Sequence, residues 1–213
     1  MELVTAINRT RYDIFRWRYE LAVPKKIFLA LGVACLVGLL AQVRLYTPWS
    51  PVPITGQTFA VLLAGVVMGR RWGAISLAIY ALLGIVGVPW FSPQAGMPIF
   101  SAGGVSHLVG PTGGYIIGFI LAALFLGYCI DRYIKARGFL SMLGLMLFAN
   151  FALIYLPGLI WLGIWLNTVS GTYITIPALI AIGATPFVVG DILKVVAAAT
   201  IAKSITPKED YSR

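Results

Sequence analysis

Asp191 and Lys194 are the residues of this chain whose type and position point most clearly to chemistry. They lie three residues apart in the apolar stretch Pro186 to Ala202, and this spacing places both side chains on one face of a helix. A charge at membrane depth is expensive, so such residues usually face a partner, a cavity or a substrate. We therefore expect the pair to contact a ligand. An ion pair that only satisfies itself is the alternative, although an apolar pair would often serve as well.

Two further segments carry polar or glycine-rich sequence where an apolar stretch begins. In VPITGQTF, the side chains of Thr55, Gln57 and Thr58 open such a stretch, where free backbone N–H groups and side-chain amides can bind a polar ligand. Ordinary N-capping by threonine explains part of this pattern. In LVGPTGGYIIGF, Gly113 and Gly114 allow a close approach of the backbone, either to a ligand or to a neighbouring helix. The spacing of Gly114 and Gly118 is that of tight helix packing, which is the alternative to a ligand.

The composition predicts the class of protein that positions these residues. Of the 213 residues, 60% are hydrophobic and 11% are charged, and the mean hydropathy is +0.91. Soluble domains carry about 25% charged residues. A transmembrane helix needs about 20 mostly apolar residues, so the chain has room for about six. We predict an all-α integral membrane domain over 27–203, with a basic cytoplasmic or interfacial segment at 1–26 and a cytoplasmic tail at 204–213.

Six transmembrane helices are expected from the apolar stretches. The turn from Gly69 to Gly73 joins the second to the third. The stretch from Thr172 to Ala184 is apolar but broken by proline and glycine, so we expect a short cap or re-entrant piece there. The expected spans are Ile27–Tyr46, Gln57–Met68, Gly73–Val88, Gly114–Ile130, Leu140–Leu166 and Pro186–Lys203.

The basic residues predict the orientation of these spans. Of the 16 lysines and arginines, only Arg44 and Lys194 fall outside the flanks and turns of one side, and the positive-inside rule makes that side cytoplasmic, with both termini on it. The net charge of +9 does not indicate nucleic-acid binding, because the basic residues sit beside apolar runs rather than among exposed aromatic residues. Between Arg9 and Tyr19 the sequence suits an interfacial helix, and a frayed tail is the alternative.

Other kinds of site have little support in the sequence. One histidine, His107, and two distant cysteines, Cys35 and Cys129, make no metal site. The cysteines are expected to be reduced and packed. No serine is placed with a histidine base, so we do not expect an enzyme. No phosphate-binding G-x-x-x-x-G-K-[ST] motif occurs, so nothing in the chain binds ATP by itself.

The first span has a face of small residues. Ala30, Ala34 and Gly38 recur every four residues, and such a face lets another helix approach closely. Docking of a partner protein is one interpretation of this face, and a pattern that recurs by chance in many spans is the alternative.

Three segments together resemble the BioY family. They are ITGQT before the second span, GPTGGY at the start of the fourth and PFxxGDxxK at the start of the sixth. The members of this family are the biotin-specific S components of energy-coupling-factor vitamin transporters. The resemblance covers Ile27 to Lys203, and the stretch from Ala30 to Ala34 resembles the AxxxA docking signature of S components. It implies the six-helix S-component fold, an outward pocket for high-affinity biotin uptake and a prokaryotic plasma membrane. It also implies a transmembrane coupling subunit and two ATPases that use ATP, with no cofactor in this chain.

The resemblance also assigns residues to biotin. Asp191 would accept a hydrogen bond from a ureido N–H, and Lys194 would donate to the ureido carbonyl. Thr55 and Gln57 are expected to add hydrogen bonds. The expected apolar or stacking walls are Phe100, Tyr115 and Trp90.

The partner of the biotin carboxylate stays open between two candidates. Arg44 is the only arginine on the outer side, but it could also extend to the membrane interface without touching a ligand. The backbone N–H groups of Gly103 and Gly104 are the competing anion site. An S component for another vitamin, or a membrane assembly protein without transport function, are the remaining alternatives for the whole chain.

Overall fold

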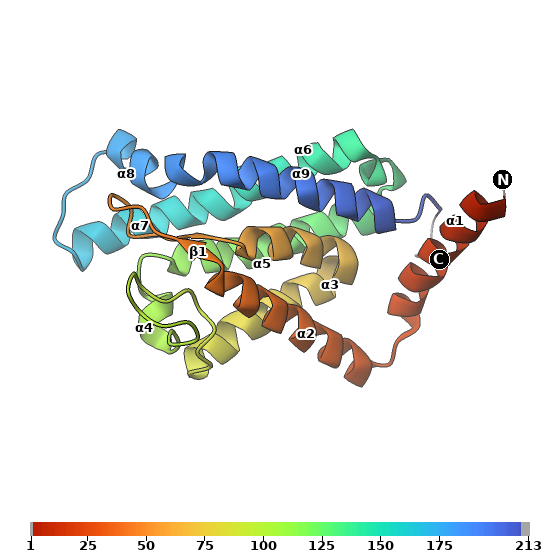
Figure 1. Cartoon of the computed structure of the whole chain (residues 1–213), viewed down its shortest axis with the longest axis horizontal. Coiled ribbons are helices and arrows are strands. Elements are labelled where there is room, and N and C mark those ends of the chain that lie inside the picture. Colours follow the sequence, from red (N-terminus) through yellow and green to blue (C-terminus); the bar gives the residue numbers. More distant parts are fainter. Residues whose placement is uncertain (1, 210–213) are drawn as a thin grey trace.

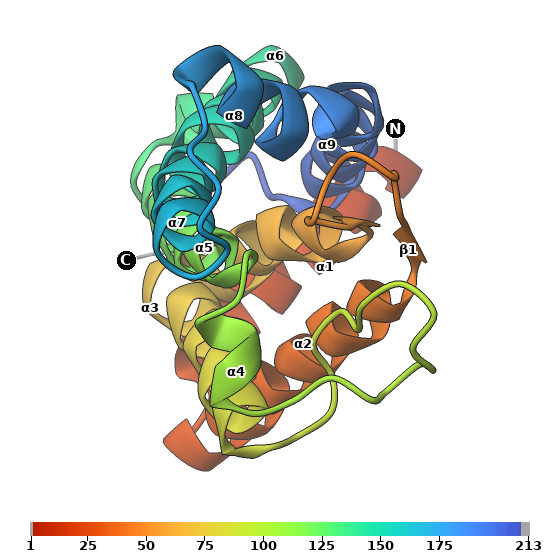
Figure 2. The same cartoon turned by 90° about the vertical axis from the view of Figure 1, so that its left-hand side faces the viewer.

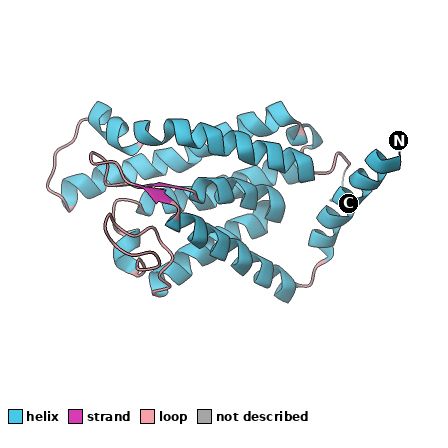
Figure 3. Cartoon of the chain, viewed as in Figure 1, coloured by secondary structure: helices cyan, strands magenta, loops and turns pink. Residues whose placement is uncertain are grey.

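The computed structural model describes residues 2–209, and almost all of its regular structure is helical (Figures 1 and 3). A two-residue antiparallel pairing, in which Arg44 faces Thr55, is the only sheet in this part of the chain. The elements are α1 (Glu2–Glu20), α2 (Val23–Gln42), β1 (Arg44–Leu45), β2 (Ile54–Thr55), α3 (Gln57–Val86), α4 (Val105–Leu108), α5 (Gly113–Arg132), η1 (Ile134–Arg137), α6 (Phe139–Phe148), η2 (Ala149–Ile154), α7 (Tyr155–Thr168), α8 (Ile176–Gly183), η3 (Thr185–Phe187) and α9 (Val188–Ile205).

Within residues 2–209, five helical segments are long and apolar enough to cross a membrane, where the sequence predicts six spans. The difference lies in α3, which contains both the second and the third expected spans. At Gly69 the backbone leaves the helical region (φ 76°, ψ −178°), and the chain turns back on itself (Figure 1). A Cβ on Gly73 would lie 3.0 Å from the backbone oxygen of Ala64, so the two arms of α3 pack tightly. The expected five-residue turn is therefore a break at one glycine.

Arg18 of α1 binds to the bend of α3 from outside. Its guanidinium donates hydrogen bonds to the backbone oxygens of Val66 and Val67, at 3.0 and 2.6 Å, and forms a 2.7 Å ion pair with Asp131 of α5. Asp131 also accepts a hydrogen bond from the backbone N–H of Arg70, at 3.1 Å. These contacts fix the end of α1 to the bundle, so the structure favours a docked helix over a frayed tail.

Replacing Arg18 with methionine is expected to reduce the free energy of unfolding by about 1–3 kcal/mol, because buried acceptors lose their donor. Arg16 is the matched control on the same helix. It pairs with Glu20 at 2.8 Å, but the two side chains are 56% and 63% exposed, and exposed pairs of this kind contribute little to stability. Thermal unfolding of both variants in detergent would check this. Equal losses in the two variants would contradict the role given to Arg18.

The small-residue face of α2 does not lie open for a partner. Ala30 and Ala34 are fully buried, and a Cβ on Gly38 would lie 2.9 Å from the Cβ of Trp90. The helix packs against α3, and bulky residues such as Phe28, 75% exposed, lie on its outer side. In this conformation the chain uses the small residues for its own packing, and the docking of a partner protein at this face stays a prediction.

Gly114 and Gly118 of α5 serve the packing of helices rather than a ligand. A Cβ on Gly114 would lie 2.2 Å from the backbone oxygen of Pro157, and one on Gly118 would lie 2.6 Å from the Cα of Ile154. Both contacts are with the long helical segment that runs from α6 through η2 to α7. Of the two possibilities that the sequence left open, the structure shows the close approach of a neighbouring helix.

The stretch from Thr172 to Ala184, which was expected to form a short cap, contains the eight-residue helix α8. This helix has a proline in its first turn. A turn of 3-10 helix, η3, then leads into α9, the helix that carries Asp191. Figure 2 looks at the end of the molecule near α8, where the β1–β2 connection and the loops around α4 also lie. The α1 helix lies at the opposite end (Figure 1).

Candidate ligand-binding site

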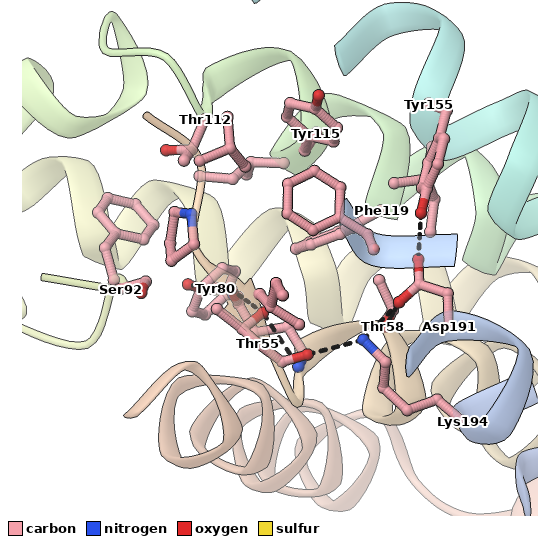
Figure 4. A pocket seen from close by; sticks show the side chains of 18 residues that line it. Thr55, Thr58, Tyr80, Ser92, Thr112, Tyr115, Phe119, Tyr155, Asp191 and Lys194 are labelled. Atoms are coloured by element: carbon pink, nitrogen blue, oxygen red, sulfur yellow. Dashed lines mark hydrogen bonds and ion pairs between the residues drawn. The ribbon is translucent and has the colours of Figure 1, made fainter. Parts of the chain in front are cut away.

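A pocket lies between β2, the start of α3, α5, the start of α7 and α9 (Figure 4). One end is polar and the walls are mainly aromatic. The aromatic residues that line it are Tyr80, Phe91, Tyr115, Phe119, Tyr155 and Phe187.

The polar end is built around the carboxylate of Asp191, which is 2% exposed. It accepts hydrogen bonds from the hydroxyl of Thr58 at 3.3 Å, the amide of Asn150 at 2.8 Å and the hydroxyl of Tyr155 at 2.6 Å. Lys194 adds an ion pair from one helical turn away. Figure 4 shows that the hydroxyls of Thr58 and Tyr155 and the amine of Lys194 converge on this group. Charge-assisted hydrogen bonds are the strong ones, so the carboxylate holds several helices together at this point.

A second set of hydrogen bonds continues from Lys194 along the pocket. Its amine also donates to the backbone oxygen of Thr55, at 2.8 Å. The hydroxyl of Thr55 donates to the side-chain oxygen of Gln57, at 3.0 Å, and the amide of Gln57 donates to the hydroxyl of Tyr80, at 2.8 Å. The residues of the ITGQT motif are therefore held in one network with the charged pair.

The segment η2 is a π-helix, and it determines how Asn150 and Tyr155 are placed. Residues five apart in an α-helix point about 140° away from each other, since each residue turns the helix by about 100°. A π-helix pairs residue i with residue i+5, so residues five apart come close to alignment. Asn150 and Tyr155 thereby reach the same oxygen of Asp191.

Aromatic contacts fix the walls. The rings of Tyr115 and Tyr155 lie 6.4 Å apart at 75°, and those of Tyr155 and Phe187 lie 6.5 Å apart at 87°. These are edge-to-face arrangements, which aromatic pairs prefer. The hydroxyl of Tyr115 donates to the backbone oxygen of Gly183, at 2.6 Å, so this ring cannot rotate freely out of the wall.

Five of the ten residues that the sequence assigns to the ligand line this pocket. They are Thr55, Gln57, Tyr115, Asp191 and Lys194. Trp90 lies behind the wall instead, where its indole N–H donates to the backbone oxygen of Tyr80, at 3.0 Å. It therefore supports a lining ring without lining the pocket itself.

The other four predicted residues lie outside the pocket. Arg44 donates to the backbone oxygen of Met97, at 2.6 Å. Phe100 is 44% exposed and its backbone N–H donates to the side chain of Gln42, at 2.9 Å. The N–H of Gly104 donates to a backbone oxygen of α3, at 2.7 Å, so it is not free for an anion. A Cβ on Gly103 would lie 2.8 Å from the backbone of the turn after α3, which shows tight packing there.

Several residues of the site were missed by the sequence analysis. Asn150 is a lone amide in the apolar stretch from Leu140 to Leu166, and the argument that singles out Asp191, polarity at membrane depth, applies to it as well. Tyr80, Phe119 and other rings carried no such signal. The chain has 11 phenylalanines and 10 tyrosines, and nothing in the pattern separates those that line the pocket.

A second cleft continues from this pocket. It has a volume of about 720 Å³, and Pro53, Ser92 and Thr112 line both spaces. Its other walls come from the β1–β2 connection, the loop between α3 and α4, α4 itself, the loop before α5 and Trp165. The pocket and the second cleft together form one continuous space, with a buried polar end, an aromatic middle and a wide opening. Among residues 2–209, no group of three or more metal-ligating side chains comes together.

Comparisons with known proteins show the family and the fold of this chain. A family model described as "BioY family" matches residues 15–210. The chain is 50% identical over 149 residues to the "Probable biotin transporter BioY" of Methanothermobacter thermautotrophicus, which covers 70% of this chain and 90% of that protein. It is 36% identical over 155 residues to the "Biotin transporter BioY" of Thermotoga maritima, which covers 73% and 81%.

A solved structure has the same fold. The S component for biotin from an energy-coupling-factor type ABC transporter matches with a TM-score of 0.72, covering 86% of this chain and 93% of that one, at 21% sequence identity. The expected S-component fold is confirmed by this match. The family match begins at residue 15, inside α1, so it includes Arg18, which the sequence resemblance left out.

Proposed function

Because the chain belongs to the BioY family, we propose that it is the biotin-binding membrane subunit of an energy-coupling-factor transporter. The relatives that support this are named as biotin transporters, and the family is one of transporters rather than enzymes. The observation that carries the proposal is the buried pair of Asp191 and Lys194 at the closed end of an aromatic pocket. A rigid polar end with apolar walls is the usual form of a small-molecule site.

The chemistry of biotin matches the two ends of this site. Its ureido group has two N–H donors and one carbonyl acceptor, and its thioether ring is apolar. We place the ureido group at the polar end, where Lys194 donates to the carbonyl and Asp191 accepts an N–H. The rings of Tyr115 and Phe119 then enclose the thioether ring.

In the structure the carboxylate already holds four protein donors, two on each oxygen. An ionised carboxylate has about four acceptor positions, so one donor must give way when a ureido N–H binds. The hydroxyl of Thr58 has the longest of the hydrogen bonds to Asp191, 3.3 Å, and we expect it to be released. The valerate chain then extends past Ser92 and Thr112 into the second cleft, where its carboxylate reaches water.

We further propose six membrane spans, with the two arms of α3 counted separately, and both termini in the cytoplasm. The support is the distribution of basic residues, which places the end near α1 inside by the positive-inside rule. The pocket then opens to the outside of a prokaryotic plasma membrane. We also propose that transport is driven by a separate coupling subunit with two ATPases, which use ATP; the support is the match to an S component of an energy-coupling-factor type ABC transporter.

Isothermal titration calorimetry of the detergent-solubilised full chain with biotin tests the proposal. We expect one saturable site per chain, with binding unaffected by excess thiamine or riboflavin. Binding of another vitamin in place of biotin would support an S component of different specificity. Folded protein that binds none of these ligands would overturn the proposal and favour an assembly protein.

A further inference from the structure

A second kind of site lies at the opposite end of the molecule from the pocket. A cleft of about 610 Å³ separates the end of α1 and the start of α2 from the bend of α3 and the end of α5. Figure 1 shows this region at the end of the bundle where α1 is attached. We call it the basic cleft, because Arg18, Lys26, Arg70, Arg71 and Arg132 all line it.

The charge of the basic cleft is not balanced by its own residues. Asp131 is the only carboxylate among the residues that line it, and this group is already bound to Arg18 and to the backbone of the α3 bend. Within residues 2–209, the guanidinium groups of Arg71 and Arg132 form no hydrogen bond or ion pair with the protein. The guanidinium of Arg70 lies over the ring of Tyr128, 5.0 Å from its centroid.

Aromatic residues form the remaining wall of the cleft. Tyr19, Trp72 and Tyr128 line it beside the arginines, and tyrosine and tryptophan are enriched at the level of lipid headgroups. Burial and, after it, the nearby charge of Asp131 raise the pKa of Tyr19. Its hydroxyl therefore stays protonated and uncharged at neutral pH, so it adds no negative charge to the cleft.

We propose that the basic cleft binds the phosphodiester headgroup of an anionic phospholipid. The planar guanidinium of arginine matches the geometry of phosphate oxygens and binds them through two parallel hydrogen bonds. Arg71 and Arg132 come from different helices and line one cavity, and we place the phosphate of the headgroup between them. The aromatic wall places this cavity where headgroups lie, and for this reason we assign the anion to a lipid rather than to the solution.

Basic residues at the cytoplasmic end of spans also serve membrane orientation without binding anything. The basic cleft goes beyond that pattern, because four separate elements bring their cations around one space. A bound headgroup would fill this space and join α1 to the bundle, in addition to the contacts of Arg18. The inference is independent of the biotin site, since none of the residues of the basic cleft lines the pocket.

The test compares lipid binding by the full chain and two double variants. In the first variant, Arg71→Gln and Arg132→Gln remove two cations from the basic cleft. In the control, Lys135→Gln and Lys203→Gln remove two cations from the same end of the molecule but outside the cleft. Native mass spectrometry then counts phosphatidylglycerol retained from mixed micelles with phosphatidylcholine, over a range of phosphatidylglycerol concentrations.

We expect the wild type to retain one phosphatidylglycerol in preference to phosphatidylcholine, with at least tenfold weaker binding in the first variant and little change in the control. A third variant, Arg71→Lys with Arg132→Lys, keeps the charge but loses the paired hydrogen bonds and should bind at an intermediate level. Calorimetry with biotin shows whether each variant is folded. Equal weakening in both Gln variants, no preference for the anionic lipid, or displacement of the lipid by millimolar inorganic phosphate would overturn the proposal.

Discussion

Replacement of Asp191 with asparagine is expected to weaken biotin binding by a hundredfold or more. The substitution keeps the size of the side chain but replaces one acceptor oxygen with an NH₂ group, which would face the donors now directed at the carboxylate. It also leaves Lys194 without its counter-charge. Removing one partner of a buried ion pair costs on the order of 3–5 kcal/mol, and each 1.4 kcal/mol corresponds to about a tenfold change in affinity. Calorimetry with biotin measures the effect directly.

A double variant separates a ligand-binding pair from a structural one. Asp191→Asn combined with Lys194→Met contains no unpaired charge, so folding should recover relative to either single variant. If the pair binds the ureido group, the affinity for biotin stays low in the folded double variant. Near-normal affinity in that protein would show that the pair is structural, and it would remove Asp191 and Lys194 from the site while leaving the fold unaffected.

Replacement of Gly118 with valine is expected to disturb the packing of the helices strongly. A Cβ at this position would lie 2.6 Å from the Cα of Ile154, so α5 and the π-helix must move apart. Overpacking of this kind costs on the order of 3 kcal/mol. Biotin affinity should fall as well, because Tyr155 follows Ile154 directly and donates to Asp191.

Gly32→Val is the matched control for this substitution. Gly32 lies in α2, and no atom lies within 4 Å of a Cβ built there. The same side chain should therefore be accepted with little loss, since valine is at least as favourable in a helix as glycine. Thermal unfolding and biotin titration of both variants provide the comparison. A stable Gly118→Val protein with normal affinity would contradict the close packing of α5.

The sequence was sufficient to predict most of the helices, because apolar stretches of the right length have few other interpretations. It also placed Asp191 and Lys194 correctly on one helix face, since i,i+3 geometry is local. The bend at Gly69 was expected as a longer turn. Its actual form depends on contacts from α1 and α5, which Arg18 and Asp131 provide, and a local pattern contains no information about them.

Predictions about which residues meet across the bundle were less successful. Ala30 and Ala34 have the spacing of a docking face, but the same spacing is needed when a helix packs closely inside its own chain. Phe100 and Arg44 belong to the same end of the molecule as the pocket. Their neighbours are set by hydrogen bonds of loops, such as that from Arg44 to Met97, which periodicity cannot predict.

The π-helix at Ala149–Ile154 implies that the spacing of two site residues and the type of helix between them must match. Asn150 and Tyr155 are five residues apart, and the wide turn brings them to one oxygen of Asp191. If one residue of this segment were deleted, the extra residue of the wide turn would be lost and a regular α-helix could form. Asn150 and Tyr155 would then be four positions apart, which in an α-helix leaves them within about 40° of each other on one face. If the wide turn were lost without a deletion, the two side chains would point about 140° apart and could not meet at one oxygen. A comparison of homologues should therefore consider the spacing between the asparagine and the tyrosine together with the type of helix that joins them.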